Sequence, residues 1–396
     1  MRKTLLRLTL VIMVVSVLVG LCLAGGDHYD IAFYEAPDQK KPLPIIINGD
    51  IKNVILFIAD GMGPAQVDAA RIGALGADGR LHFETMPIVG FSKTHSETNL
   101  VTDSAAAGTA LASGMKTYNG GICQDKKERK FATILEMAEK KGMSTGLVAT
   151  SAITHATPAS FASHVESRKM EDKIAEQIIE NDVDVILGGG RKFFIPEEED
   201  DSGRKDDMDL LKIARKKGWE IIENREELKS VKGDKILGLF QMEALTTEDA
   251  EEPSIAEMTR KAIEILSRDE DGFFLMVEGS QIDWKCHGND AEGAIRQTLL
   301  FDMAVKEGLD FAQKDGNTLV LVTADHECGG MTINEGELNG DDLELEWTTR
   351  HHSGIQVPVY AYGPGALRFT GVMDNTQIPQ RMSELLKTVP LPHILD

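Results

Sequence analysis

The segment N-V-I-L-F-I-A-D-G-M-G, residues 53–63, decides the fold class of this chain. Its apolar run at 54–59 is short, consists of Val, Ile, Leu, Phe and Ala, and ends directly in Asp60 and a glycine turn. Such a run is typical of a strand that is buried on both faces of a parallel sheet. Five more runs of this kind follow at 145–150, 183–187, 273–277, 318–323 and 357–361.

Helical patterns lie between these predicted strands. Apolar residues recur at helical spacing within 131–138, 255–265 and 295–303. Strands that alternate with helices predict an α/β fold, a three-layer α/β/α sandwich around a central, mostly parallel sheet. We expect a single domain over 25–396, with a peripheral insertion at about 192–253 whose charged stretches form solvated surface.

The composition is that of a large globular protein with an acidic surface. The 396 residues are 42% hydrophobic and 27% charged, and 64 acidic against 42 basic side chains give a formal net charge of -22. No stretch gathers Lys and Arg, so we expect no nucleic-acid binding. An anionic substrate would therefore need local positive charge at its site, which bound metal ions would supply.

The first 24 residues form a pattern typical of a secretory signal peptide. Arg2, Lys3 and Arg7 precede an apolar run at 8–23, and we expect cleavage after Ala24. Cleavage would leave the mature protein periplasmic or secreted, with no transmembrane anchor. Because the run approaches the roughly 20 residues that span a bilayer, an uncleaved segment would instead tether the protein to the membrane.

Three cysteines remain after that cleavage: Cys123, Cys286 and Cys328. An odd number of cysteines cannot all pair within one chain. Cys286 and Cys328 each lie within three residues of a candidate metal ligand, so a thiol ligand has to be weighed against a small buried side chain. We favour burial.

Acidic residues follow the apolar runs, at the edge where parallel sheets bind ligands. They are Asp60, Glu278, Asp283 and Asp325, the last followed by His326. Four carboxylates at one edge would repel one another unless cations lay among them. Asp283 and His287 are four residues apart and can reach one ion. Asp325 and His326 offer the mixed oxygen and nitrogen donors that zinc accepts, which predicts a second ion.

Ser104 lies where a loop turns into a helix of small residues, V-T-D-S-A-A-A-G-T-A at 101–110. A helix N-terminus offers unpaired amide donors and about half a positive charge, which favour phosphate binding and the ionisation of a serine. Arg168 can grip two phosphate oxygens. Taken alone, Asp103 or Ser104 is a helix N-cap and Arg168 a surface residue. The carboxylates elsewhere favour a nucleophilic serine.

Seven motifs follow one another along the chain: D-G-M-G, T-D-S-A-A, H-A-T-P-A-S-F, H-V-E-S-R, V-E-G-S-Q-I-D-W, T-A-D-H-E and H-H-S-G. They occur in the order found in the alkaline phosphatase family, and the chain resembles that family, especially its compact bacterial members, over nearly all of its mature length. The resemblance implies a homodimer that hydrolyses small phosphate monoesters. It implies in-line displacement through a covalent phosphoserine, which a zinc-bound hydroxide then hydrolyses.

The resemblance also implies a role for each matching residue. Ser104 is the nucleophile, Arg168 binds two phosphoryl oxygens, and Asp103 orients that arginine. Two zinc ions and one magnesium ion are the implied cofactors. The implied ligands are Asp283, His287 and His352 for one zinc, Asp60, Asp325 and His326 for the other, and Asp60, Thr157 and Glu278 for magnesium.

Two positions depart from the best-known bacterial pattern. His155 replaces an Asp near the third metal, and Trp284 replaces a Lys that helps to hold phosphate. Imidazole favours zinc or cobalt over magnesium, so either ion is an alternative at the third site, and His155 is a neighbour or a ligand of that ion. Loss of the ammonium group should weaken phosphate retention.

Two other functions are compatible with part of this pattern. A phosphodiesterase or sulfatase of the same superfamily also has a two-metal sheet edge, but usually carries Thr or a modified Cys where this chain has Ser104. An exported zinc-binding or phosphate-binding protein needs the ligands but no nucleophile. Hydrolysis of different esters and trapping of a phosphoserine separate these functions.

Overall fold

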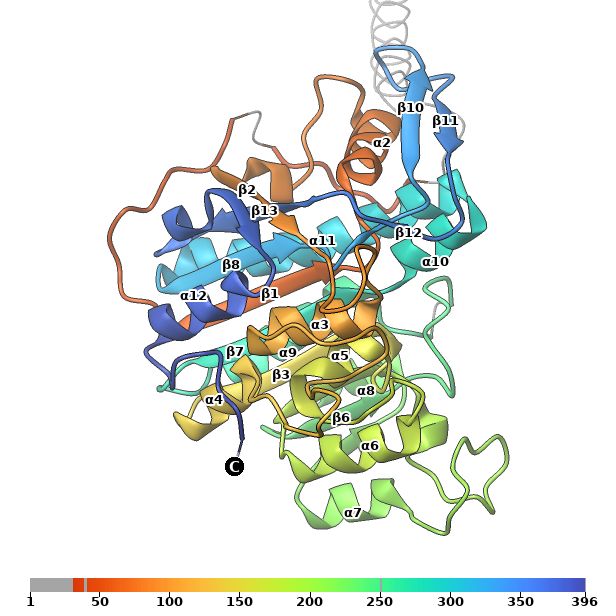
Figure 1. The fold of residues 1–396 in the computed structure, drawn as a ribbon, viewed down its shortest axis with the longest axis vertical. Coiled ribbons are helices and arrows are strands. Elements are labelled where there is room, and N and C mark those ends of the chain that lie inside the picture. Colours follow the sequence, from red (N-terminus) through yellow and green to blue (C-terminus); the bar gives the residue numbers. More distant parts are fainter. Residues whose placement is uncertain (1–30, 39–40, 250, 396) are drawn as a thin grey trace, which may run out of the picture.

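The structure is a computed structural model that describes residues 31–38, 41–249 and 251–395 (Figure 1). The signal peptide predicted for residues 1–24 lies outside the described residues. Within the described ranges, no helix has the length and apolar character needed to cross a membrane.

A ten-stranded sheet forms the middle layer (Figure 1). One strand, β13, is antiparallel to both of its neighbours, and all other neighbouring strands of this sheet are parallel. From edge to edge the strands are β14 (Gly371–Asp374), β2 (Ile88–Lys93), β13 (Val357–Tyr362), β8 (Thr318–Thr323), β1 (Asn53–Ala59), β7 (Phe273–Gly279), β3 (Ser144–Ala152), β4 (Val185–Gly189), β6 (Ile236–Leu239) and β5 (Glu220–Ile222).

All six predicted runs are strands of this sheet, which confirms the mostly parallel α/β fold. The expectation that the run at 357–361 is a parallel strand is wrong, because it lies in β13. A parallel connection needs a crossover that carries the chain back across the sheet. No helix lies between residues 324 and 356, so the chain re-enters the sheet from the edge at which β8 ends.

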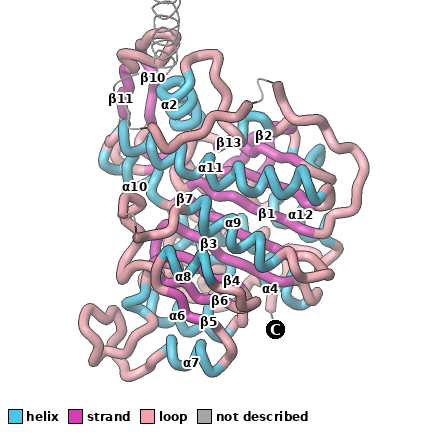
Figure 2. The backbone as a smooth tube through the Cα atoms, turned by 180° about the vertical axis from the view of Figure 1, so that it is seen from behind, coloured by secondary structure: helices cyan, strands magenta, loops and turns pink. Residues whose placement is uncertain are grey.

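Helices cover both faces of the sheet (Figures 1 and 2). One face carries α3 (Ser104–Ser113), α4 (Ile134–Lys140), α5 (Ala156–Ala162), α6 (Glu171–Glu180), α7 (Leu210–Lys216) and α12 (Gln377–Leu386). The other face carries α2 (Pro64–Leu75), α8 (Arg225–Ser230), α9 (Ile255–Leu266) and α11 (Ala291–Asp315). The residues of β1 alternate between the two cores that these layers form, so the central strand is buried on both faces.

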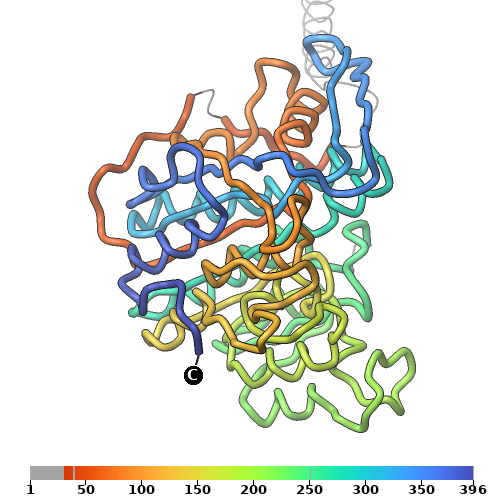
Figure 3. The backbone as a smooth tube through the Cα atoms, viewed as in Figure 1, coloured from red at the N-terminus to blue at the C-terminus, as the bar shows by residue number. Residues whose placement is uncertain are grey.

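The predicted helices at 255–265 and 295–303 lie within α9 and α11. The pattern at 131–138 begins too early, because α4 starts at Ile134. Thr133 caps this helix and forms a reciprocal capping box with Glu136, so Phe131 lies before the helix. The segment 192–253 adds β5 and β6 to one edge of the sheet. Figure 3 shows that α12, near the C-terminus, lies beside α3.

Shorter elements lie beyond the central strands. At the carboxyl end of the sheet, α10 (Gln281–Gly288) follows β7, and β9 (Glu327–Cys328) pairs with β12 (His352–Ser353). A hairpin of β10 and β11 projects from this region (Figure 1). The remaining bounds are β10 (Met331–Glu335), β11 (Glu344–Trp347), η1 (Phe83–Thr85), η2 (Arg191–Phe193) and η3 (Ala366–Phe369).

Candidate active site

Three groups of metal-ligating side chains lie together beyond the carboxyl ends of the central strands. Within each group the candidate ligand atoms lie within 4.8 Å of one another. The inner cluster is Asp60, Asp325 and His326; the outer cluster is Asp283, His287, Cys328 and His352; the third group is Asp60, His155 and Glu278. Asp60 belongs to both the inner cluster and the third group, and the His326 ring stacks on the His352 ring of the outer cluster with centroids 3.5 Å apart, so the three groups form one continuous site.

The inner cluster is fully buried. Asp60 follows β1, and Asp325 and His326 follow the neighbouring strand β8. His326 Nε2 lies 3.1 Å from Asp325 Oδ2 and 3.5 Å from Asp60 Oδ1. Both carboxylate oxygens of Asp60 and Oδ2 of Asp325 lack a hydrogen-bond donor among the described residues. Buried carboxylate oxygens without donors fit a divalent cation.

Charge in the inner cluster is not balanced by the protein. Burial, followed by repulsion from Asp325 and Asp283, raises the pKa of Asp60 well above its usual value. Burial also raises the pKa of Asp325 to about 7 and lowers the pKa of His326 well below its usual value. A dication would bind both carboxylates in their charged form and accept the lone pair of the neutral imidazole.

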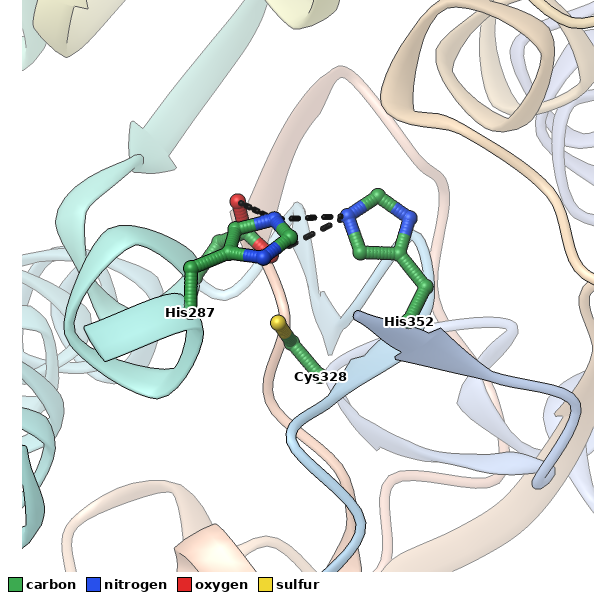
Figure 4. Close-up of side chains that lie close together, drawn as sticks. His287, Cys328 and His352 are labelled. Carbon is green, nitrogen blue, oxygen red and sulfur yellow. Dashed lines mark hydrogen bonds and ion pairs between the residues drawn. The ribbon is translucent and has the colours of Figure 1, made fainter. Parts of the chain in front are cut away.

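The outer cluster is built from α10 and the paired short strands β9 and β12 (Figure 4). Asp283 and His287 are one helical turn apart, with Oδ2 and Nε2 3.3 Å apart. His352 Nε2 lies 3.3 Å from Asp283 Oδ1 and 3.2 Å from His287 Nε2. For metal bonds of about 2.0–2.1 Å, the edge of a ligand tetrahedron is about 3.3 Å. The two Nε2 atoms and the Asp283 carboxylate therefore fit one tetrahedral ion.

Backbone carbonyls orient both imidazoles of the outer cluster. Nδ1 of His287 lies 2.6 Å from the Arg350 carbonyl, and Nδ1 of His352 lies 2.9 Å from the Thr102 carbonyl. Since a carbonyl only accepts, each neutral ring has its proton on Nδ1 and a lone pair on Nε2. Both Nε2 atoms then face Asp283 as acceptors, which is the arrangement of metal ligands.

The imidazoles and the carboxylate of the outer cluster compensate one another. The hydrogen bond with Asp283 raises the pKa of His287 to about 9. Burial opposes ionisation of Asp283, but its interactions with His287 and His352 outweigh burial and hold its pKa well below the usual range. Without a metal ion, a protonated His287 therefore balances the charge of the Asp283 carboxylate within this cluster, whereas the inner cluster has no such balance.

The third group surrounds the end of β7. Glu278 Oε2 accepts hydrogen bonds from the Ser151 and Ser280 hydroxyls at 3.2 and 2.7 Å. Glu278 Oε1, Thr157 Oγ1 and His155 Nδ1 are buried without a partner among the described residues. Burial raises the pKa of Glu278 to about 7, and burial with the Arg168 charge lowers that of His155 to about 3. These oxygen atoms fit a hard cation.

Ser104 is the first residue of α3, and its Oγ lies 3.3 Å from His326 Nε2. The preceding residue, Asp103, caps the helix by accepting from the Ala106 amide at 3.0 Å. Its other oxygen accepts from Arg168 Nη1 at 3.2 Å, while Arg168 Nη2 donates to His155 Nε2 at 3.1 Å. The capping residue therefore also holds the arginine beside Ser104.

A pocket of about 500 Å³ opens over these groups. Trp284 lies at its mouth, 38% exposed, and packs edge-to-face against His155 with ring centroids 5.9 Å apart. His351 also lines the pocket, 6.3 Å from the His287 ring. The lining includes Asp103, Ser104, His155, Arg168, Asp283, Trp284, His287 and His352, so residues predicted from distant motifs lie around one pocket.

Sequence reasoning missed two supports of the site. Gly61 has φ +80°, and a Cβ there would lie 2.7 Å from Asp283 Cα, so only glycine lets the end of β1 approach α10. The D-G-M-G motif was the available signal for this position. Ser151 orients Glu278 from another strand, and no local pattern marks it.

The cysteines differ in their surroundings, although all three are buried and unpaired. Cys123 Sγ donates to the Ser160 carbonyl at 2.9 Å, and Cys286 Sγ accepts from Gln66 Nε2 at 3.8 Å. The prediction of a small buried side chain therefore fits Cys123 and Cys286. Cys328 is equally buried, but its sulfur belongs to the outer cluster.

Comparisons with known proteins agree with one another. The family model described as alkaline phosphatase matches residues 51–342 and 340–388. Alkaline phosphatase 4 of Bacillus subtilis (strain 168) is 35% identical, with 94% of this chain and 95% of that protein covered. The alkaline phosphatase of the Antarctic bacterium TAB5 matches in structure with TM-score 0.78 and 37% identity, covering 86% of this chain and 99% of that one. A variant of the TAB5 enzyme with magnesium bound in its M3 site has a TM-score of 0.77, 36% identity and the same coverage.

Proposed function

Because the chain belongs to the alkaline phosphatase family and is a phosphomonoester hydrolase, we propose that it acts through a covalent phosphoserine at Ser104. The observation that carries this proposal is the position of Ser104 Oγ at the N-terminus of α3, 3.3 Å from His326 of the inner cluster. Arg168 lines the same pocket.

We assign one divalent cation to each ligand group. Zinc suits the inner and outer clusters, whose donors combine oxygen and nitrogen. Magnesium suits the oxygen atoms of the third group, and it is bound in the M3 site of a TAB5 variant in which a histidine is replaced by aspartate; zinc or cobalt is the alternative here because of His155. When bound, such ions neutralise charge on the entering and leaving oxygens and lower the pKa of water. The ligands are Asp283, His287 and His352; Asp60, Asp325 and His326; and Asp60, Thr157 and Glu278.

The N-terminus of α3 favours the ionised form of the Ser104 hydroxyl, because its partial positive charge lies at the oxygen. The hydroxyl proton leaves to solvent. Attack of Oγ on phosphorus forms the Oγ–P bond while the ester P–O bond breaks. The alcohol departs on the opposite side and takes up a proton from water.

Arg168 holds the phosphoryl group during this exchange. Asp103 accepts a hydrogen bond from Nη1 of Arg168, and His155 accepts one from Nη2. Each terminal nitrogen keeps a second hydrogen, so the guanidinium can donate to two phosphoryl oxygens at once. Asp103 and His155 thus act as positioning residues for the arginine.

Water attacks the phosphoserine from the side that the alcohol has left. A new O–P bond forms, the Oγ–P bond breaks, and Ser104 recovers a proton. The products are inorganic phosphate and an alcohol, and two inversions retain the configuration at phosphorus. Since the charged contacts are made to the phosphoryl group, we expect many small monoesters to be accepted.

We further propose that the protein is exported to the periplasm or the medium and acts as a homodimer. The signal-peptide pattern in residues 1–24 supports export. The resemblance to the family supports the dimer. Fractionation of the producing cells and sedimentation of the mature protein test these two proposals.

Ser104→Ala tests the covalent mechanism. Acid quenching during hydrolysis of p-nitrophenyl phosphate should trap phosphate on Ser104, detected by mass spectrometry. The variant should lose the adduct and at least about 10⁴-fold in kcat, as other covalent hydrolases do without their nucleophile. Ser113→Ala is a matched control, since Ser113 is a buried serine in the same helix whose hydroxyl bonds the Thr109 carbonyl. Faster turnover of the bis(p-nitrophenyl) ester or the sulfate would contradict the assignment.

A further inference from the structure

We propose that Cys328 is a sulfur ligand of the ion held by Asp283, His287 and His352. The proposal rests on the proposed function in one respect, which is that the outer cluster binds a divalent cation. It changes the donor set of that cluster from one oxygen and two nitrogens to one oxygen, two nitrogens and one sulfur.

Backbone pairing positions this sulfur. Cys328 in β9 lies directly opposite His352 in β12 in an antiparallel pair. Side chains of directly opposed residues project to the same side, with Cβ atoms about 4.5–5.5 Å apart. Figure 4 shows the sulfur directed toward the two imidazole rings, and it lies within 4.8 Å of the ligand atoms of the other three residues.

The atoms around this sulfur are acceptors. Asp283 is 5% exposed, and its Oδ1 is buried without a hydrogen-bond donor among the described residues. When these two rings are neutral, the Nε2 atoms of His287 and His352 carry lone pairs, because their Nδ1 atoms donate to carbonyls. A buried oxygen, two nitrogens and a sulfur around one point fit a cation. Coordination would release the thiol proton to solvent.

The short strand that carries Cys328 is fixed by its neighbour Glu327. Glu327 Oε1 accepts from Gln66 Nε2 at 3.0 Å and from the Gly330 amide at 2.8 Å. Its other oxygen accepts from the Ser353 hydroxyl in β12. These bonds join β9 to α2 and β12, so Cys328 keeps its place opposite His352.

Cys286 provides an internal comparison. It lies on α10 between Asp283 and His287, is fully buried, and has a hydrogen-bond donor in Gln66. It belongs to none of the three ligand groups. Proximity to ligands along the sequence is therefore not what singles out Cys328.

A thiolate ligand would change which ions the outer cluster prefers. Soft sulfur favours zinc and cadmium over magnesium or manganese, whereas the inner cluster offers only oxygen and nitrogen. Because zinc can accept a fifth ligand, a site with Cys328 as the fourth protein ligand would still be able to bind a phosphoryl oxygen. Cys328 would thus be a residue that determines metal selectivity.

Cobalt substitution tests the proposal without reference to activity. The wild-type chain, Cys328→Ser and Cys286→Ser are freed of metal and titrated with Co²⁺ while the absorption spectrum is recorded. We expect a thiolate-to-cobalt charge-transfer band in the wild type and in Cys286→Ser. In Cys328→Ser this band should be absent while the visible d–d bands remain. Loss of a ligand should weaken binding at the outer cluster by at least about tenfold, as even outer-shell changes do.

The spectra separate two kinds of failure. Visible d–d bands without a charge-transfer band in the wild type would overturn the role of Cys328 and leave the proposed cation sites intact. A charge-transfer band that persists in Cys328→Ser would also overturn it. Absence of all cobalt bands in the wild type would contradict the cation sites themselves, and with them the proposed function.

Discussion

The inner and outer clusters lie side by side but differ in how far their imidazoles balance the charge of their carboxylates. The outer cluster pairs Asp283 with two imidazoles, and the pKa of Asp283 lies well below its usual value. The inner cluster places Asp60 and Asp325 around one neutral imidazole, and the pKa of each carboxyl is raised. The inner cluster therefore depends on a cation for its charge balance, whereas the outer cluster does not.

The inner and outer clusters also differ in solvent exposure. The side chains of Asp60 and His326 are fully buried, whereas 38% of the His287 side chain is exposed. Inner ligands follow strands within the sheet, whereas Asp283, His287 and His352 of the outer cluster lie on α10 and β12 and line the pocket. We infer that the inner ion anchors the site and that the outer ion exchanges more readily.

Replacing the shared carboxylate should have the largest effect. Asp60→Asn removes a ligand from both the inner cluster and the third group. We expect loss of two ions per chain and a decrease in kcat/KM of at least about 10³-fold, since each removed source of charge stabilisation costs about 10²–10³-fold. Asp283→Asn, in the outer cluster, should lose one ion only. Metal analysis of both purified variants measures the number of ions bound per chain. Equal losses of metal in the two variants would contradict the shared role of Asp60.

We expect the unbalanced charge of the inner cluster to lower the stability of the folded protein once its metal ions are removed by a chelator. The pKa of Asp325 is raised to about 7 in the folded protein, so ionisation of this carboxyl opposes folding as pH rises from about 4 to about 7. Each unit of pKa difference is worth about 1.4 kcal/mol. Asp325→Asn keeps an oxygen for the Gly61 and His326 amides, so the chelated variant should gain stability over chelated wild type across this window.

Urea denaturation at a series of pH values measures this difference. Saturating zinc should reverse it, because the wild-type carboxylate then has its cation. A stability difference that stays constant from pH 4 to pH 7 would show that burial does not raise the pKa of the Asp325 carboxyl.

The third group should give the smallest effect. His155→Asp replaces an imidazole by a carboxylate beside Glu278 and Asp60, and carboxylates suit magnesium better. We expect added magnesium to stimulate the variant about tenfold more than the wild type, the lower range for changes around metal ligands. His351→Ala, in the same pocket but outside the third group, should respond like the wild type. An unchanged magnesium titration curve for His155→Asp would contradict this assignment.

Much of the inner cluster was predictable because it follows strands. Asp60 and Asp325 each come directly after an apolar run, and parallel neighbouring strands end at one edge. The outer cluster was only partly predictable. Asp283 and His287 show helical spacing, but His352 was selected by the H-S-G motif of the family. The direction of β13 was missed, since strand direction depends on the path of the connection.

The sequence by itself determined six strands of the sheet, the edge that carries the carboxylates, and Ser104 at the start of a helix, because these follow from local periodicity and from where each apolar run stops. Only the tertiary structure decided that Cys328 lies opposite His352, and that the carbonyls of Thr102 and Arg350 fix the imidazole tautomers. Pairings between short irregular segments and contacts to backbone carbonyls leave no pattern in side-chain order. They arise when distant parts of the chain pack together.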